Sequence, residues 1–356
     1  MRRTASPLSL ILLGLGAFML VLAPMLAWYV EPRAKRTPVD IDTITVFKGK
    51  GSYFDTEKIK TVHDKNLTVT RQVRGDVADS TKEHAVWDVV TSIDPDKSLP
   101  ASDPHDSLQF TTERWVTDRE TNKPVHCCDE KPYFEGEAYL KFPFDVQKRS
   151  YTWWDNTLGA TVPLTFRGTK KIQGYEGYRF TAEVKAAKTG TRLVPGRLVG
   201  QPKRSNVLAE EWYANHGVEF VADKRTGRII YAATGPRKTL RAPGSDKDAT
   251  VLLDSERIAF TPKTQKAQVK LADDDSSRLK LVGETLPLGV GVLGVVLAIA
   301  GGVLVVRGRR SDSGADGRGG SDGLDGPGGS DGPGTAAEPN GPHTDTSPTP
   351  LQPTTM

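Results

Sequence analysis

Two long apolar runs divide the chain into a polar centre and two polar ends. Residues 4–30 contain no charged side chain, and neither do residues 285–306. A helix of about 20 residues rises about 1.5 Å per residue and therefore crosses the ~30 Å hydrocarbon core of a bilayer. The pattern predicts two transmembrane helices, over residues 8–30 and 285–306.

Charged residues at the outer ends of both runs predict the orientation of these helices. Arg2 and Arg3 precede the first run, and a basic cluster at residues 307–310 follows the second. Positively charged flanks favour the cytoplasmic side of a membrane. We therefore expect both termini, including residues 1–7, to be cytoplasmic, and residues 31–284 to lie outside the plasma membrane.

A cleaved signal peptide is the alternative interpretation of the first run. The apolar region of a signal peptide normally has about 7–15 residues and ends at a cleavage site with small residues. Here the run is longer, Ala23 is followed by Pro24, and Met25 lies two residues before Ala27. The sequence therefore favours an uncleaved anchor.

Small residues recur at every fourth position in both runs. They are Ala23 and Ala27 in the first run, and Gly294, Ala298 and Gly302 in the second. This spacing lets helix backbones approach closely in lipid. Either the two helices pack together or dimerise at these positions, or the residues only reflect the composition of such helices. The sequence leaves both interpretations open.

The region between the runs shows the alternation that is typical of β-strands. β-branched and aromatic residues alternate with polar ones and are separated by turn residues. The clearest segments are residues 67–73, 85–90, 161–166, 177–184 and 249–254. A short helix over residues 276–283 is expected to lead into the second run. The predicted fold is a mainly β domain of antiparallel sheets, a sandwich or barrel-like, between two transmembrane helices.

Two segments of this domain align with each other without gaps, one beginning at Trp115 and the other at Phe220. Each reads as a β-hairpin in which an Asp accepts backbone hydrogen bonds and an Asn or Gly takes the left-handed conformation. The turn residues are Asp118 and Asn122 in the first segment, and Asp223 and Gly227 in the second. An internal duplication and a recurrent hairpin loop both explain the similarity.

Charge is distributed unevenly along the chain. Residues 31–284 hold 42 Lys and Arg against 37 Asp and Glu, and the two signs are interleaved. No run of bases indicates a nucleic-acid groove, so we expect no nucleic-acid partner. Residues 307–356 are rich in Gly, Ser, Asp, Pro and Thr and contain few large apolar residues, which predicts a disordered cytoplasmic tail.

The chain has one pair of cysteines, the adjacent Cys127 and Cys128. Outside the membrane the environment is oxidising, so a vicinal disulfide is expected, either as a local staple or as a redox-sensitive element. His126, Asp129 and Glu130 beside them resemble a set of metal ligands. Adjacent cysteines are poorly spaced to bind one zinc ion, however. We therefore predict no metal site, and no cofactor.

Aromatic residues stand beside acids at two places in the sequence. The candidate ligand-contact aromatics are Trp153, Trp154, Trp212 and Tyr213, with Asp155 and Glu211 as neighbouring carboxylates. Aromatics beside carboxylates can bind sugars, and paired carboxylates can cleave glycosidic bonds. Alternating aromatics in strands are more often core residues. No catalytic residue is predicted, and we expect the protein not to be an enzyme.

Three stretches together resemble a family of actinobacterial envelope proteins labelled the porin PorA family. They are Trp28 and Tyr29 at the end of the first run, the Tyr-Thr-Trp-Trp sequence at residues 151–154, and residues 219–230. The resemblance covers about residues 8–306. It implies an N-terminal anchor, a β-rich extracytoplasmic region and a C-terminal anchor, and it supplies no catalytic residues.

Three hypotheses for the function follow. In the first, a non-enzymatic envelope protein binds a lipid, a cell-wall glycan or a protein partner near the membrane surface. The second is a channel or porin-like permeability factor, and the third is an envelope hydrolase that acts on glycan. In each case the protein is integral to the bilayer, and assembly into a homo-oligomer is compatible with the sequence.

Overall fold

The computed structural model describes residues 7–95 and 107–312, with side chains as far as residue 307. The chain divides into two units, Met1–Val305 and Val306–Met356. The first unit contains the β domain and the apolar helices. Of the second unit, only the end of the last helix is described, so the predicted tail from residue 313 onward lies outside the described residues.

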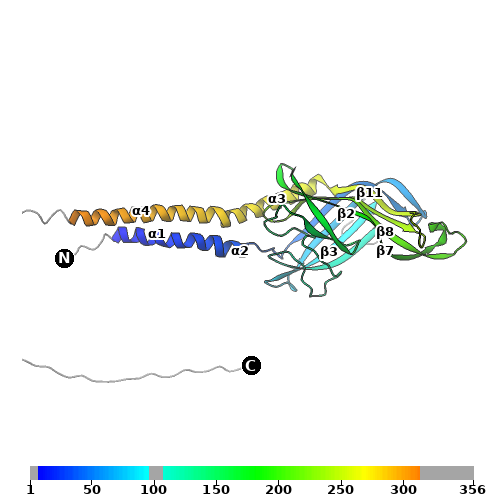
Figure 1. The fold of residues 1–356 in the computed structure, drawn as a ribbon, viewed down its shortest axis with the longest axis horizontal. Helices are drawn as coiled ribbons and strands as arrows, with labels where there is room; N and C mark the ends of the chain where they lie inside the picture. The colour runs from blue at the N-terminus through cyan, green and yellow to red at the C-terminus, as the bar shows by residue number, and fades with distance from the viewer. Residues whose placement is uncertain (1–6, 96–106, 313–356) are drawn as a thin grey trace, which may run out of the picture. The chain divides into compact units, whose positions relative to one another are not determined.

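Two helical stretches, Pro7–Ala34 and Pro262–Arg307, are long and apolar enough to cross a membrane. The first comprises α1 (Pro7–Met25), a π-helical turn (Leu26–Val30) and α2 (Glu31–Ala34). The second comprises α3 (Pro262–Lys280), a π-helical turn (Leu281–Thr285) and α4 (Leu286–Asp312). Both predicted apolar segments are therefore helical, and α1 and α4 lie side by side (Figure 1).

Small residues let the backbones of α1 and α4 approach closely. A Cβ atom added to Gly16 would lie 2.5 Å from the Ala298 nitrogen, and one added to Gly301 would lie 2.7 Å from the Leu13 nitrogen. A Cβ atom added to Gly294 would lie 3.1 Å from the Gly16 oxygen. Contacts as short as the first two exclude any side chain at Gly16 and Gly301 in this packing.

The structure distributes the predicted small residues unevenly along this contact. Gly294 and Ala298 lie against α1, whereas a Cβ atom added to Gly302 would meet nothing within 4 Å. The Ala23 Cβ atom lies 3.5 Å from the position of a Cβ added to Gly291. Ala27 lies in the π-helical turn after α1 and is partly buried. The close contact therefore involves Gly294 and Ala298 together with Gly16 and Gly301.

Helix α3 begins earlier than the sequence predicts. The expected helix over residues 276–283 is only the end of a longer one that starts at Pro262. The Thr261 hydroxyl accepts a hydrogen bond from the Thr264 nitrogen, and a proline in the first turn has no amide proton to leave unsatisfied. The prediction of the start was wrong because this Thr-Pro cap was not taken into account.

In residues 7–95 and 107–312, eleven strands form the β domain, and all named strand pairs are antiparallel. They are β1 (Asp42–Asp55), β2 (Lys60–Asp76), β3 (His84–Pro95), β4 (Gln109–Asp118), β5 (Tyr151–Asp155), β6 (Ala160–Ile172), β7 (Tyr175–Pro195), β8 (Asn206–Ala222), β9 (Ile229–Thr234), β10 (Pro236–Arg241) and β11 (Thr250–Phe260). The order is β4-β3-β2-β1-β11-β10-β8-β7-β6-β5, and β9 pairs with β8 and β11. The prediction of an antiparallel β domain between two apolar helices is confirmed.

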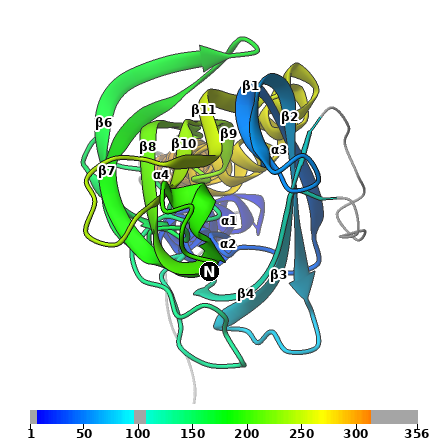
Figure 2. The same cartoon turned by 90° about the vertical axis from the view of Figure 1, so that its right-hand side faces the viewer.

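The sheet is strongly curved, as the view along the helices shows (Figure 2). In the described residues its end strands, β4 and β5, are not paired with each other. The segment over residues 119–150 lies between them instead. It forms a bridge from Lys131 to Arg114 on β4 and another from Ala138 to Trp153 on β5. A largely irregular segment therefore closes the gap in the curved sheet.

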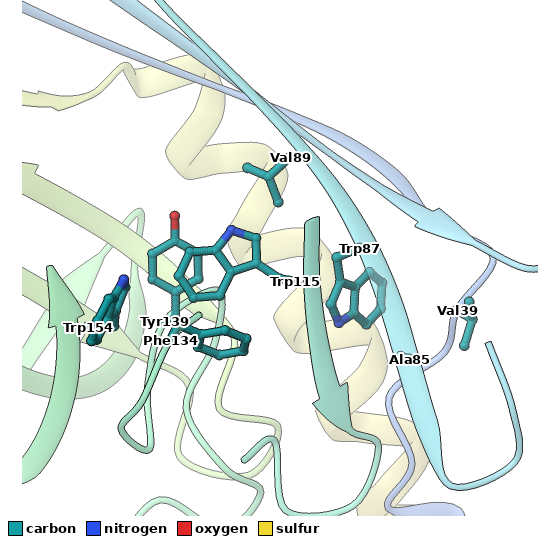
Figure 3. Close-up of a cluster of buried hydrophobic side chains, with 8 residues drawn as sticks. All are labelled: Val39, Ala85, Trp87, Val89, Trp115, Phe134, Tyr139 and Trp154. Carbon is teal, nitrogen blue, oxygen red and sulfur yellow. The ribbon is translucent and has the colours of Figure 1, made fainter. Parts of the chain in front are cut away.

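An aromatic cluster holds this segment against the sheet (Figure 3). The fully buried Trp115 on β4 stacks on Tyr139, with ring centroids 3.4 Å apart, and meets Phe134 edge-on at 4.0 Å. The Tyr139 hydroxyl and the Trp115 indole each donate a hydrogen bond of 2.7 Å to Glu113. Apolar burial and satisfied polar groups therefore fix residues 134–139 in place.

Candidate functional site

The curved sheet, α3 and the segment 119–150 enclose a cavity of about 370 Å³. This volume falls within the roughly 300–1,000 Å³ of small-molecule sites. Its lining includes Phe47 on β1 and Phe260 on β11, whose ring centroids are 4.6 Å apart. Trp153 on β5 and Phe220 on β8 continue the wall, with centroids 5.6 Å apart. The walls are therefore largely aromatic and apolar.

The cavity reaches the surface beside the helices. Ala34 at the end of α2 and Pro38 just after it belong to the lining and are exposed. Arg278 near the end of α3 also belongs to the lining and is exposed. Both sides of this opening are thus within a few residues of the long apolar helices, so a ligand can enter or leave at the end of the domain nearest to them.

Basic side chains gather in the lining of this mostly apolar cavity. The charged lining residues are Arg36, Arg71, Lys141, Arg228, Arg278 and Asp275. Five bases and one acid give the lining a net charge of +4. Arg36 pairs with Glu120 outside the lining, at 2.7 Å, so part of this charge is compensated from the surface.

Lys141 is one of the partly buried cations of the lining. Its side chain keeps some accessible surface because it faces the cavity, yet protein atoms surround it. Burial, and then the nearby charge of Arg228, lower the pKa of the Lys141 amine to about 7. The amine donates a hydrogen bond of 3.1 Å to the Thr37 hydroxyl and lies 3.7 Å from the centroid of the Phe144 ring. Among the described residues, no carboxylate lies within ion-pair distance of it.

Arg228 occupies the neighbouring wall. One terminal nitrogen donates a hydrogen bond of 3.0 Å to Asp275 on α3. Its Nε atom is buried and has no hydrogen-bond partner in the described part of the chain. A buried donor without an acceptor costs free energy. The Arg228 side chain as a whole is 23% exposed and belongs to the cavity lining.

The two turns that resemble each other in sequence have the same geometry. Thr121 and Thr226 each donate a backbone hydrogen bond of 2.7 Å to the Asp three residues earlier, Asp118 and Asp223 respectively. Asn122 and Gly227 take the left-handed conformation, with φ of 60° and 73° respectively. The shared sequence therefore encodes one local structure twice.

Both turns hold the backbone on either side of Lys141. The Asn122 side chain donates a hydrogen bond of 2.7 Å to the carbonyl oxygen of Lys141, and the Phe142 amide donates one of 2.8 Å to the carbonyl oxygen of Gly227. A Cβ atom at Gly227 would lie 2.1 Å from the Phe142 oxygen. We call this arrangement the turn clamp. It fixes the backbone from which the Lys141 side chain reaches the cavity.

The four predicted ligand-contact aromatics lie in different environments. Trp153 lines the cavity. Trp154 is buried in the cluster that contains Trp115 (Figure 3). Trp212 packs under the Arg241 guanidinium, 4.0 Å from its ring centroid, and Tyr213 is buried with its hydroxyl 2.8 Å from Asp155. The structure therefore brings only Trp153 of these four to the wall of this cavity.

The two carboxylates beside these aromatics have structural partners. Asp155 is buried and accepts backbone hydrogen bonds of 2.9 and 3.0 Å from Thr157 and Leu158, as well as the bond from Tyr213. Burial raises the pKa of Asp155. Glu211 forms an ion pair of 2.5 Å with Arg192 on the neighbouring strand. Asp155 therefore stabilises the turn after β5, and Glu211 the pairing of β7 with β8.

Cys127 and Cys128 are joined by a disulfide bond. The His84 Nε2 atom lies 3.9 Å from the first sulfur and 3.6 Å from the second. These three residues could gather around a metal ion only if both sulfurs were thiolates, and here each sulfur is bonded to the other. His126, by contrast, pairs with Glu130 at 2.7 Å.

No pattern in the sequence marked Lys141 or Arg228 as residues of a candidate site. Lys141 stands between Leu140 and Phe142, a pattern that normally places a lysine on the solvent side of a strand. Arg228 is one base among many at a turn. Only the meeting of distant segments encloses the two side chains in one cavity.

Comparison with known proteins identifies the family. The family described as Porin PorA matches residues 8–303. No curated protein matches the chain. Among solved structures, a MaoC domain protein from Chloroflexus aurantiacus J-10-fl is 14% identical over 69% of this chain and 80% of that chain, with a TM-score of 0.12, and such a likeness carries no argument. The family match and the two apolar helices make this a membrane protein, and the chain belongs to the porin PorA family.

Proposed function

We propose that this protein is a non-enzymatic envelope protein that binds a membrane amphiphile in the cavity of its outer β domain. The observation that carries the proposal is the 370 Å³ cavity with aromatic walls, which reaches the surface beside Ala34, Pro38 and Arg278. An apolar chain that leaves a bilayer would meet this opening first. Its transfer to the cavity walls would keep its apolar surface away from water.

The proposed topology places this opening at the outer membrane–water boundary. Helices α1 and α4 span the plasma membrane, both termini are cytoplasmic, and residues 31–284 lie outside. The basic residues next to the two chain termini, before the first helical stretch and at the end of the second, favour this orientation.

Ion pairs support a fixed distance between cavity and membrane. Lys35, just after α2, pairs with Asp145 at 2.6 Å, and Arg225 pairs with Glu284 in the turn before α4 at 2.7 Å. These contacts join the β domain to both helical stretches. The opening would therefore stay close to the lipid head groups.

A channel is the second candidate, because the family description names a porin. A membrane-spanning barrel has a continuous apolar band on its lipid-facing side. Here Phe220 on β8 faces the cavity, and its neighbour Glu219 lies on the opposite face of the sheet with three cationic partners. This charged group supports a water-exposed domain more than a lipid-embedded one.

The test uses the full chain, purified in a nonionic detergent and examined by native mass spectrometry. We expect one co-purifying amphiphile per chain. Thr43→Trp would fill the cavity and remove that amphiphile, because Thr43 lines the cavity on β1. The matched control is Ile44→Trp, since Ile44 is the next residue on the strand and is 57% exposed. A chain without bound amphiphile, or equal occupancy in Thr43→Trp and the control, would contradict the proposal.

The channel is tested separately in planar bilayers. Stepwise single-channel currents from the full-length protein, unchanged in Thr43→Trp, would favour a permeability function over binding in the cavity. The binding proposal expects no such currents at any protein load.

A further inference from the structure

We infer that the amphiphile carries an anionic head group, a carboxylate or a phosphate, and that Lys141 and Arg228 bind it. This inference rests on the proposed function, and it adds the chemical class of the ligand and the residues that select it.

The first argument is the charge balance around Lys141. Most buried charges in proteins are paired, because an isolated buried charge is costly. Arg228 has Asp275 at 3.0 Å, but Lys141 has only the Thr37 hydroxyl and the face of the Phe144 ring. Among the described residues, Lys141 is therefore a lining cation without a counter-ion, as are Arg71 and Arg278, and an anionic ligand would supply one.

The second argument is the donor that Arg228 leaves unused. Its Nε atom is buried without an acceptor, although the same side chain is held in place by Asp275. A carboxylate or phosphate presents several acceptor oxygens close together. One head group could therefore accept from Arg228 and from Lys141 at once, whereas a lone hydroxyl offers only one oxygen atom.

The third argument is that the charged and the apolar parts of the cavity lie at different places, with Lys141 at one end and the Phe47–Phe260 pair further along β1. Lys141 bonds to Thr37, which lies at the end of the cavity next to α2. From that end, β1 leads through Thr43 and Thr45 to Phe47, and a strand rises about 3.3 Å per residue. A ligand with its head at Lys141 would have its chain beside β1 and against the Phe47–Phe260 pair. This is the polarity of an amphiphile and not of a free inorganic anion.

The fourth argument is preorganisation. The turn clamp holds the backbone of residues 141–142 from both sides, through Asn122 and Gly227. Two separate turns thus support a lysine that forms no ion pair with any residue the structure describes. Rigid support around an uncompensated charge is typical of a binding site.

The experiment compares two probes that differ only in the head group. The full chain in nonionic detergent is mixed at pH 7 with equimolar oleate and oleyl alcohol, and native mass spectrometry measures the ratio of the two bound species. We expect at least a tenfold preference for oleate. Lys141→Met should reduce that preference to about one. The matched control is Lys148→Met, since Lys148 is exposed in the same segment, and it should keep the preference.

Each other outcome has a definite meaning. Equal binding of both probes to the wild type would overturn the anionic head group and leave the amphiphile-binding function intact. Binding of neither probe would overturn both. Displacement of oleate by inorganic phosphate alone, at similar concentration, would show that a free anion and not a lipid is the ligand, and would overturn this inference. Loss of oleate binding in Lys141→Met cannot be attributed to unfolding if its melting temperature is at least that of the wild type, which is the result we expect.

Discussion

Two buried charged side chains of the β domain have opposite surroundings. Glu219, on the sheet face opposite to the cavity, accepts hydrogen bonds of 2.7 Å from Lys170, Arg179 and Arg257. Burial alone would raise the pKa of Glu219, but the three cations outweigh burial and lower the pKa to about 2. Lys141, inside the cavity, has no acid at ion-pair distance among the described residues, and its pKa falls to about 7.

The comparison distinguishes a charge that stabilises the fold, that of Glu219, from a charge that does not, that of Lys141. The cations around Glu219 come from β6, β7 and β11, so this acid joins three other strands to β8. Lys141 forms no ion pair within the described ranges of the chain. Residues that serve binding often reduce the stability of the free protein. Selection removes them only if stability falls below the level that function requires. The two residues should therefore respond to substitution with opposite signs.

The largest effect is expected from Glu219→Gln. The change leaves three cations around an uncharged amide and should lower the free energy of unfolding by about 2–4 kcal/mol, somewhat less than for a fully enclosed pair because the cations reach solvent. Denaturant unfolding of the full chain in nonionic detergent measures it. The control is Glu183→Gln, an exposed acid on β7, which should change stability by less than about 0.5 kcal/mol. A loss below about 1 kcal/mol for Glu219→Gln would show that the cluster is solvated and weak.

Gly227→Ala tests the turn clamp. The new Cβ would meet the Phe142 oxygen at 2.1 Å, and the residue has a positive φ of 73°. We expect a loss of about 2–3 kcal/mol, from strain and steric overlap together. Gly159→Ala is the control, because Gly159 also has a positive φ but open space around it, so it should lose only about 1 kcal/mol. Equal losses would mean that the contact with Phe142 adds nothing.

Lys141→Met should raise the free energy of unfolding by about 1–3 kcal/mol, because it removes a buried charge that lacks a counter-ion. The measurement is denaturant unfolding of delipidated full chain at pH 6, where the lysine is charged. A decrease in stability would indicate that Lys141 is part of the structural core, and the contrast with Glu219 would no longer hold.

The smallest effect is expected from a change of pH. The free energy of unfolding changes by at most about 1.4 kcal/mol per pH unit for one titrating group. Glu219 has a lowered pKa, so its contribution is complete above its ordinary pKa of 4.5 and is lost as the pH falls toward about 2. Lys141 also has a lowered pKa, but it is a base. Between pH 7 and 10.5 the unfolded chain binds the proton that the folded chain has released, so stability rises with pH there.

The increase in stability between pH 7 and 10.5 can be assigned to Lys141 only if the charged groups that face it do not titrate in the same range. They are Arg228, Asp275 and Asp223. The side chains that ordinarily titrate between pH 7 and 10.5 are those of cysteine, tyrosine and lysine, and none of these three residues is of those types. The difference between wild type and Lys141→Met should therefore shrink steadily over this window. A constant difference would mean that Lys141 keeps its ordinary pKa in the folded protein.

Local sequence was sufficient for the parts of the fold that depend on neighbouring residues. The two apolar runs predicted the helices α1 and α4, and alternation predicted segments of β2, β3, β6, β7 and β11. The Asp, Asn and Gly residues of the two similar turns indicated their geometry, because the hydrogen bonds involved lie within five residues. The start of α3 at Pro262 was missed, although a local cap encodes it.

The candidate site could not be predicted in the same way. Trp153, chosen for its aromatic character, lines the cavity, but Trp154 beside it is buried in the aromatic cluster, since successive strand residues point to opposite faces. Nothing near Lys141 in the sequence marks it as a lysine without a counter-ion. That property depends on the partners that the nearby acids have in the folded chain: Asp275 on α3 pairs with Arg228, and Asp223 accepts hydrogen bonds from Thr226.

The sequence by itself determined that this protein has two apolar helices on either side of a β domain, because length, hydrophobicity and alternation act over short stretches of chain. The tertiary structure decided which charges are compensated. Glu219 gains its cations from three other strands. Lys141 has no acid at ion-pair distance among the described residues, and its neighbours Thr37 and Asp275 come from segments more than 100 residues before and after it in the sequence. The reason is physical: the free energy of a buried charge depends on everything within a few ångströms of it, and the order of residues along the chain does not specify those neighbours.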